Sequence, residues 1–240
     1  MQQLTIDICL LGKAEFDIDI KVLRKYRSKV FLITDIRNRG ILPECDLSDW
    51  GYSDEILAGL FQPLLNSKFT VGVIDAPLED NYYMRRISKN QCVISLFEIK
   101  EILQLHQVSL EHFIVRNIYE LILIYHKFKG IIPTSVYQIA HSDIRRCLFD
   151  MSGIKTDILY SMIKPIICEK CTTELQSSGV DKYIIKQVTI EIRRINIDLT
   201  KRLISFIKKH PFLSISLTSL FAVFLNVVSN LTYNNFFNWS

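Results

Sequence analysis

Four residues between positions 141 and 171 have the types and the spacing of a metal site. Cys168 and Cys171 form a Cys-x-x-Cys pair. Twenty residues separate Cys147 from this pair, and His141 lies shortly before Cys147. Thiolate and imidazole are the ligands of tetrahedral zinc. Because four protein ligands leave no open position for water, we expect a structural Zn²⁺ cofactor whose binding contributes to folding. Three ordinary cysteines and a surface histidine are the alternative, and a redox Cys-x-x-Cys is disfavoured because no thioredoxin-like context surrounds it.

A polar loop between two predicted strands could bind a ligand. Residues 79–86 combine two acids, two tyrosines and two arginines, and a following helix places more polar groups on one face. Loops at strand ends commonly hold ligands. The alternative is a salt-bridged loop that packs against the helix. The candidate ligand-binding residues are Glu79, Asp80, Tyr82, Arg85, Arg86, Arg116 and Glu120.

The elements that must position these residues follow from apolar runs and capping signals. Strands are predicted at 4–11, 29–34, 69–74 and 92–96. Helices are predicted at 53–65, 95–105, 109–128, 157–163 and 180–209. Residues 14–26 could form a helix or a second hairpin, and their alternating pattern favours a strand. Residues 38–50 are predicted to be a loop. Strands mixed with helices before Gly130, followed by helices, indicate a three-layer α/β head.

The end of the chain has the composition of a membrane anchor. Residues 211–240 contain no Asp, Glu, Lys or Arg, and a membrane-spanning helix needs about 20 mostly apolar residues. Two lysines precede the segment and aromatic residues follow it, which is the usual anchoring pattern. A buried core helix is the alternative. We predict one transmembrane helix at 211–231 and a short tail at 232–240, with Phe212, Leu217, Leu220, Phe224 and Val228 in the bilayer.

The basic charge of the chain is concentrated just before this segment. Residues 179–210 hold eight bases and three acids, whereas the whole chain has a formal net charge of +4. This placement favours anionic lipid headgroups over nucleic acid, so no nucleic-acid partner is expected, although a basic stalk that binds nucleic acid is a third alternative. The predicted domains are a head at 1–175, a basic amphipathic stalk at 179–210, the anchor and the tail. The stalk either self-associates or lies on the head or the bilayer.

The order of a cysteine and a methionine, then a Cys-x-x-Cys pair, resembles the C-terminal zinc module of archaemetzincins. Cys147, Cys168 and Cys171 would match three of that family's four cysteine ligands, with His141 near the fourth and Met151 near its methionine. The runs Phe-Thr-Val-Gly-Val-Ile-Asp and Cys-Val-Ile-Ser-Leu-Phe-Glu-Ile resemble its central strands. The resemblance spans residues 4–175 and implies a metzincin-like mixed sheet.

The chain departs from this family at the catalytic motif. A metzincin needs His-Glu-x-x-His and a third histidine, so that imidazoles on one helix face bind zinc and the glutamate activates water. Here His106, His112 and His126 include no two histidines four residues apart. The resemblance therefore implies a degenerate metzincin without its catalytic metal, and we predict no catalytic residues.

These observations together predict a membrane-anchored, non-enzymatic sensor or effector. It would be a single-pass protein of the cell inner membrane with its N-terminal head in the cytoplasm. Bacterial stress or antiviral (anti-phage) defence is the associated role. The alternative is a membrane-tethered hydrolase, peptidase-like or phosphate-directed, that uses a non-standard site. The expected partners are the lipid bilayer, a second copy through stalk and anchor, and a protein or small ligand that the sequence does not identify.

Overall fold

The chain forms two units, residues 1–196 and 197–240. A computed structural model describes residues 3–12, 17–48, 50–135, 139–195, 207 and 210–237, without the side chains of 213, 214, 217 and 230–237. The first unit contains the sheet, most of the helices and the candidate site residues.

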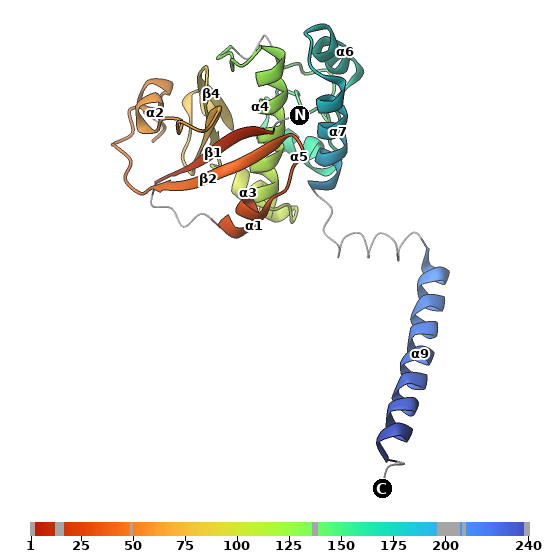
Figure 1. Cartoon of the computed structure of the whole chain (residues 1–240). Helices are drawn as coiled ribbons and strands as arrows, with labels where there is room; N and C mark the ends of the chain where they lie inside the picture. Colours follow the sequence, from red (N-terminus) through yellow and green to blue (C-terminus); the bar gives the residue numbers. More distant parts are fainter. Residues whose placement is uncertain are drawn as a thin grey trace. The chain divides into compact units, whose positions relative to one another are not determined.

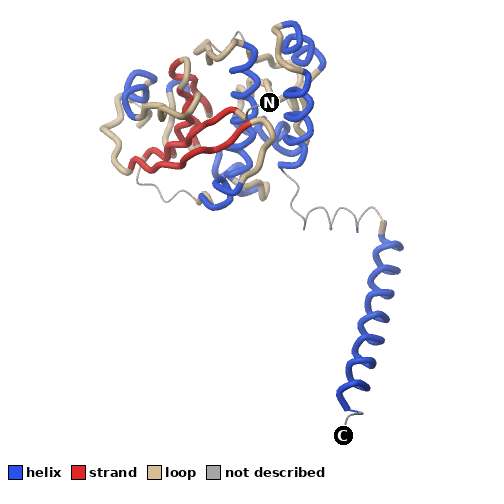
Figure 2. The backbone as a smooth tube through the Cα atoms, viewed as in Figure 1, coloured by secondary structure: helices blue, strands red, loops and turns tan. Residues whose placement is uncertain are grey.

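A five-stranded mixed sheet organises the first unit (Figures 1 and 2). Its order is β2-β1-β3-β5-β4, where four strands run parallel and β4 runs antiparallel to β5 at one edge. Strands β3 and β5 are buried along their whole length, because helices cover both faces of the sheet. The strands are β1 (Leu4–Leu11), β2 (Phe31–Arg39), β3 (Phe69–Ile74), β4 (Met84–Ser88) and β5 (Gln91–Ser95).

Two hydrophobic cores lie on opposite faces of this sheet. Ile8 faces the larger core, which also contains the apolar residues of α4 and α7, whereas its neighbour Cys9 faces the smaller core under α2. The alternation follows from the two-residue repeat of a strand. The α-helices of the described residues are α1 (Ile20–Lys25), α2 (Asp54–Leu60), α3 (Ile99–Leu105), α4 (Leu110–Lys127), α5 (Ile158–Ile163), α6 (Glu169–Ser177), α7 (Lys182–Ile195) and α9 (Pro211–Phe237).

Helix α4 is the central helix of the first unit. Ser109 caps it, and the Ser109 hydroxyl accepts a hydrogen bond from the amide of His112 at 3.2 Å. Apart from His112, the helix is buried from Leu110 to Ile124 because the sheet covers one side and α7 packs on the other (Figure 1). It therefore holds even its charged residues, Arg116 and Glu120, away from solvent.

Four elements differ from the sequence prediction. Residues Ile20–Lys25 form a helix and not a strand, because the Asp19 carboxylate accepts a hydrogen bond from the amide of Lys21 at 2.8 Å and so caps a helical turn. Strand β4 (Met84–Ser88) overlaps the segment 79–86, which was predicted to be a loop. Helix α6 begins directly at the Cys-x-x-Cys pair and was not predicted. The predicted helix 180–209 is seen as Lys182–Ile195, and most of its remainder lies outside the described residues.

The predicted membrane anchor is wrong. Segment 211–231 does form a helix, α9. Among the residues that the structure describes, however, no helix combines the length and the apolar character that a membrane span requires. The polar side chains of Ser216, Thr218, Ser219 and Asn226 dilute the apolar run, and such groups are costly to place in hydrocarbon.

The other membrane predictions are corrected with the anchor. They placed Phe212, Leu217, Leu220, Phe224 and Val228 in a bilayer, and the side chain of Leu217 lies outside the described residues. The same finding overturns the transmembrane helix in the predicted fold class, the inner-membrane location with a cytoplasmic head, and the bilayer and the stalk and anchor as partner surfaces. It also overturns the membrane-anchored sensor or effector, with its role in defence, and the membrane-tethered hydrolase.

Candidate metal centre and adjoining cavity

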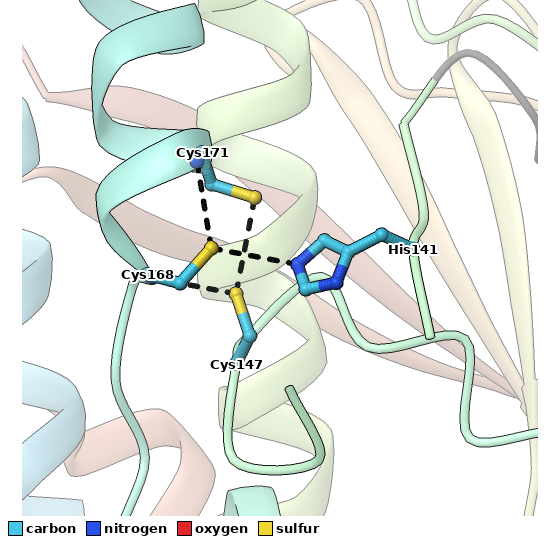
Figure 3. A group of neighbouring side chains, drawn as sticks. All are labelled: His141, Cys147, Cys168 and Cys171. Carbon is cyan, nitrogen blue, oxygen red and sulfur yellow. Dashed lines mark hydrogen bonds between the residues drawn. The ribbon is translucent and has the colours of Figure 1, made fainter. Parts of the chain in front are cut away.

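The side chains of His141, Cys147, Cys168 and Cys171 converge on one point (Figure 3). Their ligand atoms, three sulfurs and one imidazole nitrogen, all lie within 4.8 Å of one another. The three cysteines are buried and the histidine is half-buried. Two separate segments thus supply the cluster, a loop at 141–147 and the first turn of α6.

Two of the distances between ligand atoms match those expected around a tetrahedral ion. For zinc–sulfur bonds of about 2.3 Å and a zinc–nitrogen bond of about 2.05 Å, tetrahedral angles place two sulfurs about 3.8 Å apart and sulfur and nitrogen about 3.6 Å apart. The sulfurs of Cys147 and Cys171 are 3.9 Å apart, and the sulfur of Cys168 lies 3.6 Å from Nε2 of His141. This group can therefore hold a metal ion such as zinc.

Backbone hydrogen bonds hold the thiols in place. Cys168 is the N-cap of α6, and its sulfur accepts a hydrogen bond from the amide of Cys171 at 3.4 Å. The amide of Cys168 in turn donates to the sulfur of Cys147 at 3.5 Å. On the other segment, isolated parallel bridges join His141 to Asp150 and Cys147 to Ile166. The positions of the four ligands are thus set by main-chain contacts as well as by side-chain packing.

The thiols differ in acidity. The hydrogen bond with the sulfur of Cys171 and that from the amide of Cys168 together lower the pKa of Cys147 to about 4, against the effect of burial. The same sulfur contact raises the pKa of Cys171, and burial adds to that rise. Thiolate is the form that binds a metal. Cys147 is therefore the ligand most ready to bind first, and ligation would deprotonate the others.

A cavity of about 240 Å³ lies beside the loop that carries His141 and Cys147. Of the seven predicted ligand-binding residues, five line it: Asp80, Tyr82, Arg85, Arg86 and Glu120. The remaining lining residues are Tyr83, Met84, Thr134, Ser135, Ala140, Asp150 and Met151. The structure thus brings β4, α4 and the loop that follows the metal ligands to one hollow.

The two predicted residues that do not line the cavity each pair with one that does. Oε2 of Glu79 lies 3.6 Å from Nη2 of Arg85. Arg116 is fully buried, and its Nη1 donates to Oε2 of Glu120 at 2.5 Å. Burial raises the pKa of Glu120, although the charge of Arg116 opposes that rise. The Nη2 atom of Arg116 also donates to the carbonyl of Leu148 at 2.5 Å, which ties α4 to the loop that carries Cys147.

Arg85 makes the salt bridges that were considered as the alternative for this loop. Its guanidinium donates to both carboxylate oxygens of Asp54 in α2, at 2.6 and 3.0 Å, and to Asp80 at 3.4 Å. The hydrogen bond to Asp54 raises the pKa of Arg85. Arg85 therefore has counter-ions of its own.

Sequence reasoning missed several residues of the cavity. Tyr83, Asp150 and Met151 line it, and Asp150 is 2% exposed. Asp150 follows the apolar pair Leu148 and Phe149, and an acid directly after a buried run was the signal that could have indicated it. The three histidines His106, His112 and His126 do not belong to the group that could hold a metal among the described residues.

Comparisons with known proteins give one structural match. No protein-family model matches the chain, and no curated protein matches it. The structure is similar to the crystal structure of archaemetzincin from Methanopyrus kandleri, with a TM-score of 0.43 and 14% identity. The match covers 72% of this chain and 94% of that chain. The resemblance stated from the sequence is confirmed at this level, and a likeness this distant says nothing of activity.

Proposed function

We propose that the first unit is a zinc-binding domain in which Zn²⁺ is a structural cofactor. The observation that carries the proposal is the convergence of three sulfurs and one imidazole nitrogen within 4.8 Å of one another, from segments far apart in the sequence. Four protein ligands fill the coordination sphere of zinc and leave no position for a water or a substrate. An ion at this site would therefore hold the fold and not perform a reaction.

The choice of zinc rests on the chemistry of the donor atoms. Calcium and magnesium take oxygen ligands, and this group offers none. Thiolates favour zinc, copper(I) and iron–sulfur clusters, and a tetrahedral set of mixed sulfur and nitrogen is typical of zinc. The bridge between His141 and Asp150 fixes the main chain of the one nitrogen ligand, so the four donors are largely preorganised.

The place of the site in the fold indicates what the ion would stabilise. Cys147, Cys168 and Cys171 belong to the large hydrophobic core, together with Leu148 and Leu175. An ion that joins the loop to α6 would close that core over one side of α4. Its binding free energy would then add to the stability of the whole first unit.

Metal analysis of the purified full chain tests the proposal. We expect one zinc per chain and its loss in Cys171→Ser. The matched control is Cys45→Ser, because Cys45 is exposed and lies outside the cluster. A Cys171→Ser variant that keeps a full equivalent of zinc would contradict the assignment, as would a chain that takes up no zinc when it is refolded with the metal.

A further inference from the structure

The cavity beside the metal centre contains a buried cation that makes no hydrogen bond and no close ion pair with the described residues. Arg86 lines it and is 8% exposed, and its Nε atom has no hydrogen-bond partner. Within the described part of the chain, no hydrogen bond and no close ion pair reaches this guanidinium, although it lies near Tyr83, Cys92 and Glu120. A buried charged group normally has a partner, because leaving it unpaired costs free energy.

A carboxylate oxygen without a hydrogen bond belongs to the same cavity lining. The Oδ1 atom of Asp150 is buried and accepts no hydrogen bond, and it forms only a long ion pair of 3.8 Å with Nη1 of the exposed Arg145. The other oxygen, Oδ2, lies 3.3 Å from the hydroxyl of Ser152, which donates to it. No hydrogen bond joins Asp150 to the ring of His141 in the described residues, and Nδ1 of that ring also lacks a partner.

The other charged residues of the cavity already have partners. Glu120 is paired with Arg116, and Asp80 with Arg85. Among the described residues, the charged cavity groups left without a hydrogen bond are therefore the guanidinium of Arg86 and Oδ1 of Asp150, and both residues are nine-tenths buried or more. Arg86 is a cationic hydrogen-bond donor and Asp150 is an acidic acceptor. A complementary ligand would therefore carry an anionic acceptor and a cationic donor.

We propose that this cavity binds a small zwitterion of the amino-acid class. The ligand carboxylate would accept two parallel hydrogen bonds from Arg86, the geometry that guanidinium and carboxylate prefer. Its ammonium group would donate to Oδ1 of Asp150. The volume of 240 Å³ is just below the range of about 300–1,000 Å³ for drug-sized ligands, which suits a single small molecule.

A phosphate fits the site less well than a carboxylate. The carboxylates of Asp80, Glu120 and Asp150 all line the cavity, and a dianion would be repelled by them more strongly than a molecule without net charge. The proposal concerns a site apart from the four metal ligands and does not depend on the identity of the ion.

Binding measurements on the full chain, with its metal content determined beforehand, test the proposal. Thermal shift with each standard amino acid identifies a ligand, and calorimetry then gives its affinity. Acetate, methylammonium and inorganic phosphate serve as probes that carry one charged group only. We expect at least one amino acid to bind, and each single-group probe to bind at least tenfold more weakly.

Variants test whether ligand binding depends on Arg86 and Asp150. Arg86→Gln should weaken binding at least tenfold. Arg86→Lys should retain only part of the parent affinity, because lysine cannot donate two parallel hydrogen bonds to one carboxylate. Lys89→Gln is the matched control, since it removes one positive charge from the same hairpin and Lys89 does not line the cavity. If Arg86→Gln is poorly folded by circular dichroism, Asp150→Asn provides a second test, with the same expected loss.

Three results would overturn the proposal. The first is that no amino acid binds to well-folded, metal-loaded protein. The second is that phosphate or acetate binds as tightly as any amino acid. The third is that Arg86→Gln, or Asp150→Asn in its place, binds with the affinity of the Lys89→Gln control. Loss of the metal in the parent chain would be detected separately and would count against the zinc site alone.

Discussion

The sulfur atoms of Cys147 and Cys171 lie 3.9 Å apart although the residues are 24 positions apart in the sequence. A disulfide would need a separation of about 2.05 Å, so the two thiols are neighbours that are not bonded. The distance is instead that of two ligands on one tetrahedral ion. The central relationship in this domain is therefore a contact between two segments that a metal ion would complete.

Removal of the metal should destabilise the first unit. An ion at the proposed site would join the loop around Cys147 to α6, and without it three buried thiols, one of them acidic, face each other in the core. We expect a strong chelator to lower the melting temperature by at least 10 °C, since structural zinc contributes about 10 kcal/mol or more in small domains and a few kcal/mol already give such a shift. Differential scanning calorimetry with and without chelator measures this. An unchanged melting temperature after complete zinc loss would contradict a structural role.

The buried ion pair of α4 should be costly to break. Arg116 and Glu120 are 1% and 4% exposed, so neither charge can turn to water when its partner is removed. Glu120→Ala should lower the free energy of unfolding by about 3–5 kcal/mol. Urea titration of the zinc-loaded protein provides the measurement. Glu174→Ala is the control, because it removes a more exposed carboxylate that pairs with Lys127. It should lower the free energy of unfolding by less than about 1 kcal/mol. Similar losses of unfolding free energy in both variants would argue against the burial of the α4 pair.

The carboxylate of Glu191 should hold α7 to the edge of the sheet. It accepts hydrogen bonds from the hydroxyls of Tyr119 at 2.5 Å and Ser28 at 2.7 Å, and from the amide of Lys29 at 3.0 Å. Glu191→Ala leaves these donors unpaired and should destabilise the first unit by about 3 kcal/mol. Hydrogen exchange should show faster opening of α7 in this variant. Arg193→Ala changes an exposed residue of the same helix and should leave hydrogen exchange unchanged. Equal exchange rates in the two variants would contradict the role of Glu191 in holding α7.

High pH should destabilise the first unit through Tyr83. Burial raises the pKa of this tyrosine to about 12 from its usual value of 10.0. Because the folded state favours the neutral phenol, its contribution is fully present below pH 10 and is lost as the pH rises through 12, a change of about 2–3 kcal/mol. The free energy of unfolding measured across this range should fall more steeply in the parent chain than in Tyr83→Phe. Parallel curves for the two proteins would contradict the assignment.

The sequence predicted the elements whose apolar pattern is local. Strands Leu4–Leu11 and Phe69–Ile74 were placed at their observed ends, because both are apolar runs between turn residues. Helix Leu110–Lys127 was predicted from Ser109 and from its apolar spacing. The four metal ligands were also named in advance, since their types and spacing alone indicate metal chemistry.

The elements that were missed depend on contacts between distant residues. Strand β4 carries two arginines, and only its pairing with β5 and the burial of Arg86 make it a strand. Helix α6 is short and polar on its outer side, and its start is fixed by the sulfur of Cys168 as cap. The lack of a hydrogen bond at Nε of Arg86 and at Oδ1 of Asp150 is a property of the folded cavity, which no local pattern in the sequence encodes.

X-ray absorption at the zinc edge of the purified full chain tests the central claim most directly. The four-ligand site predicts a first shell of three sulfurs at about 2.3 Å and one nitrogen at about 2.0–2.1 Å. In His141→Ala the nitrogen should disappear from the shell while the three sulfurs of Cys147, Cys168 and Cys171 remain. A shell dominated by oxygen, or one that is the same in the parent chain and in Cys171→Ser, would contradict it.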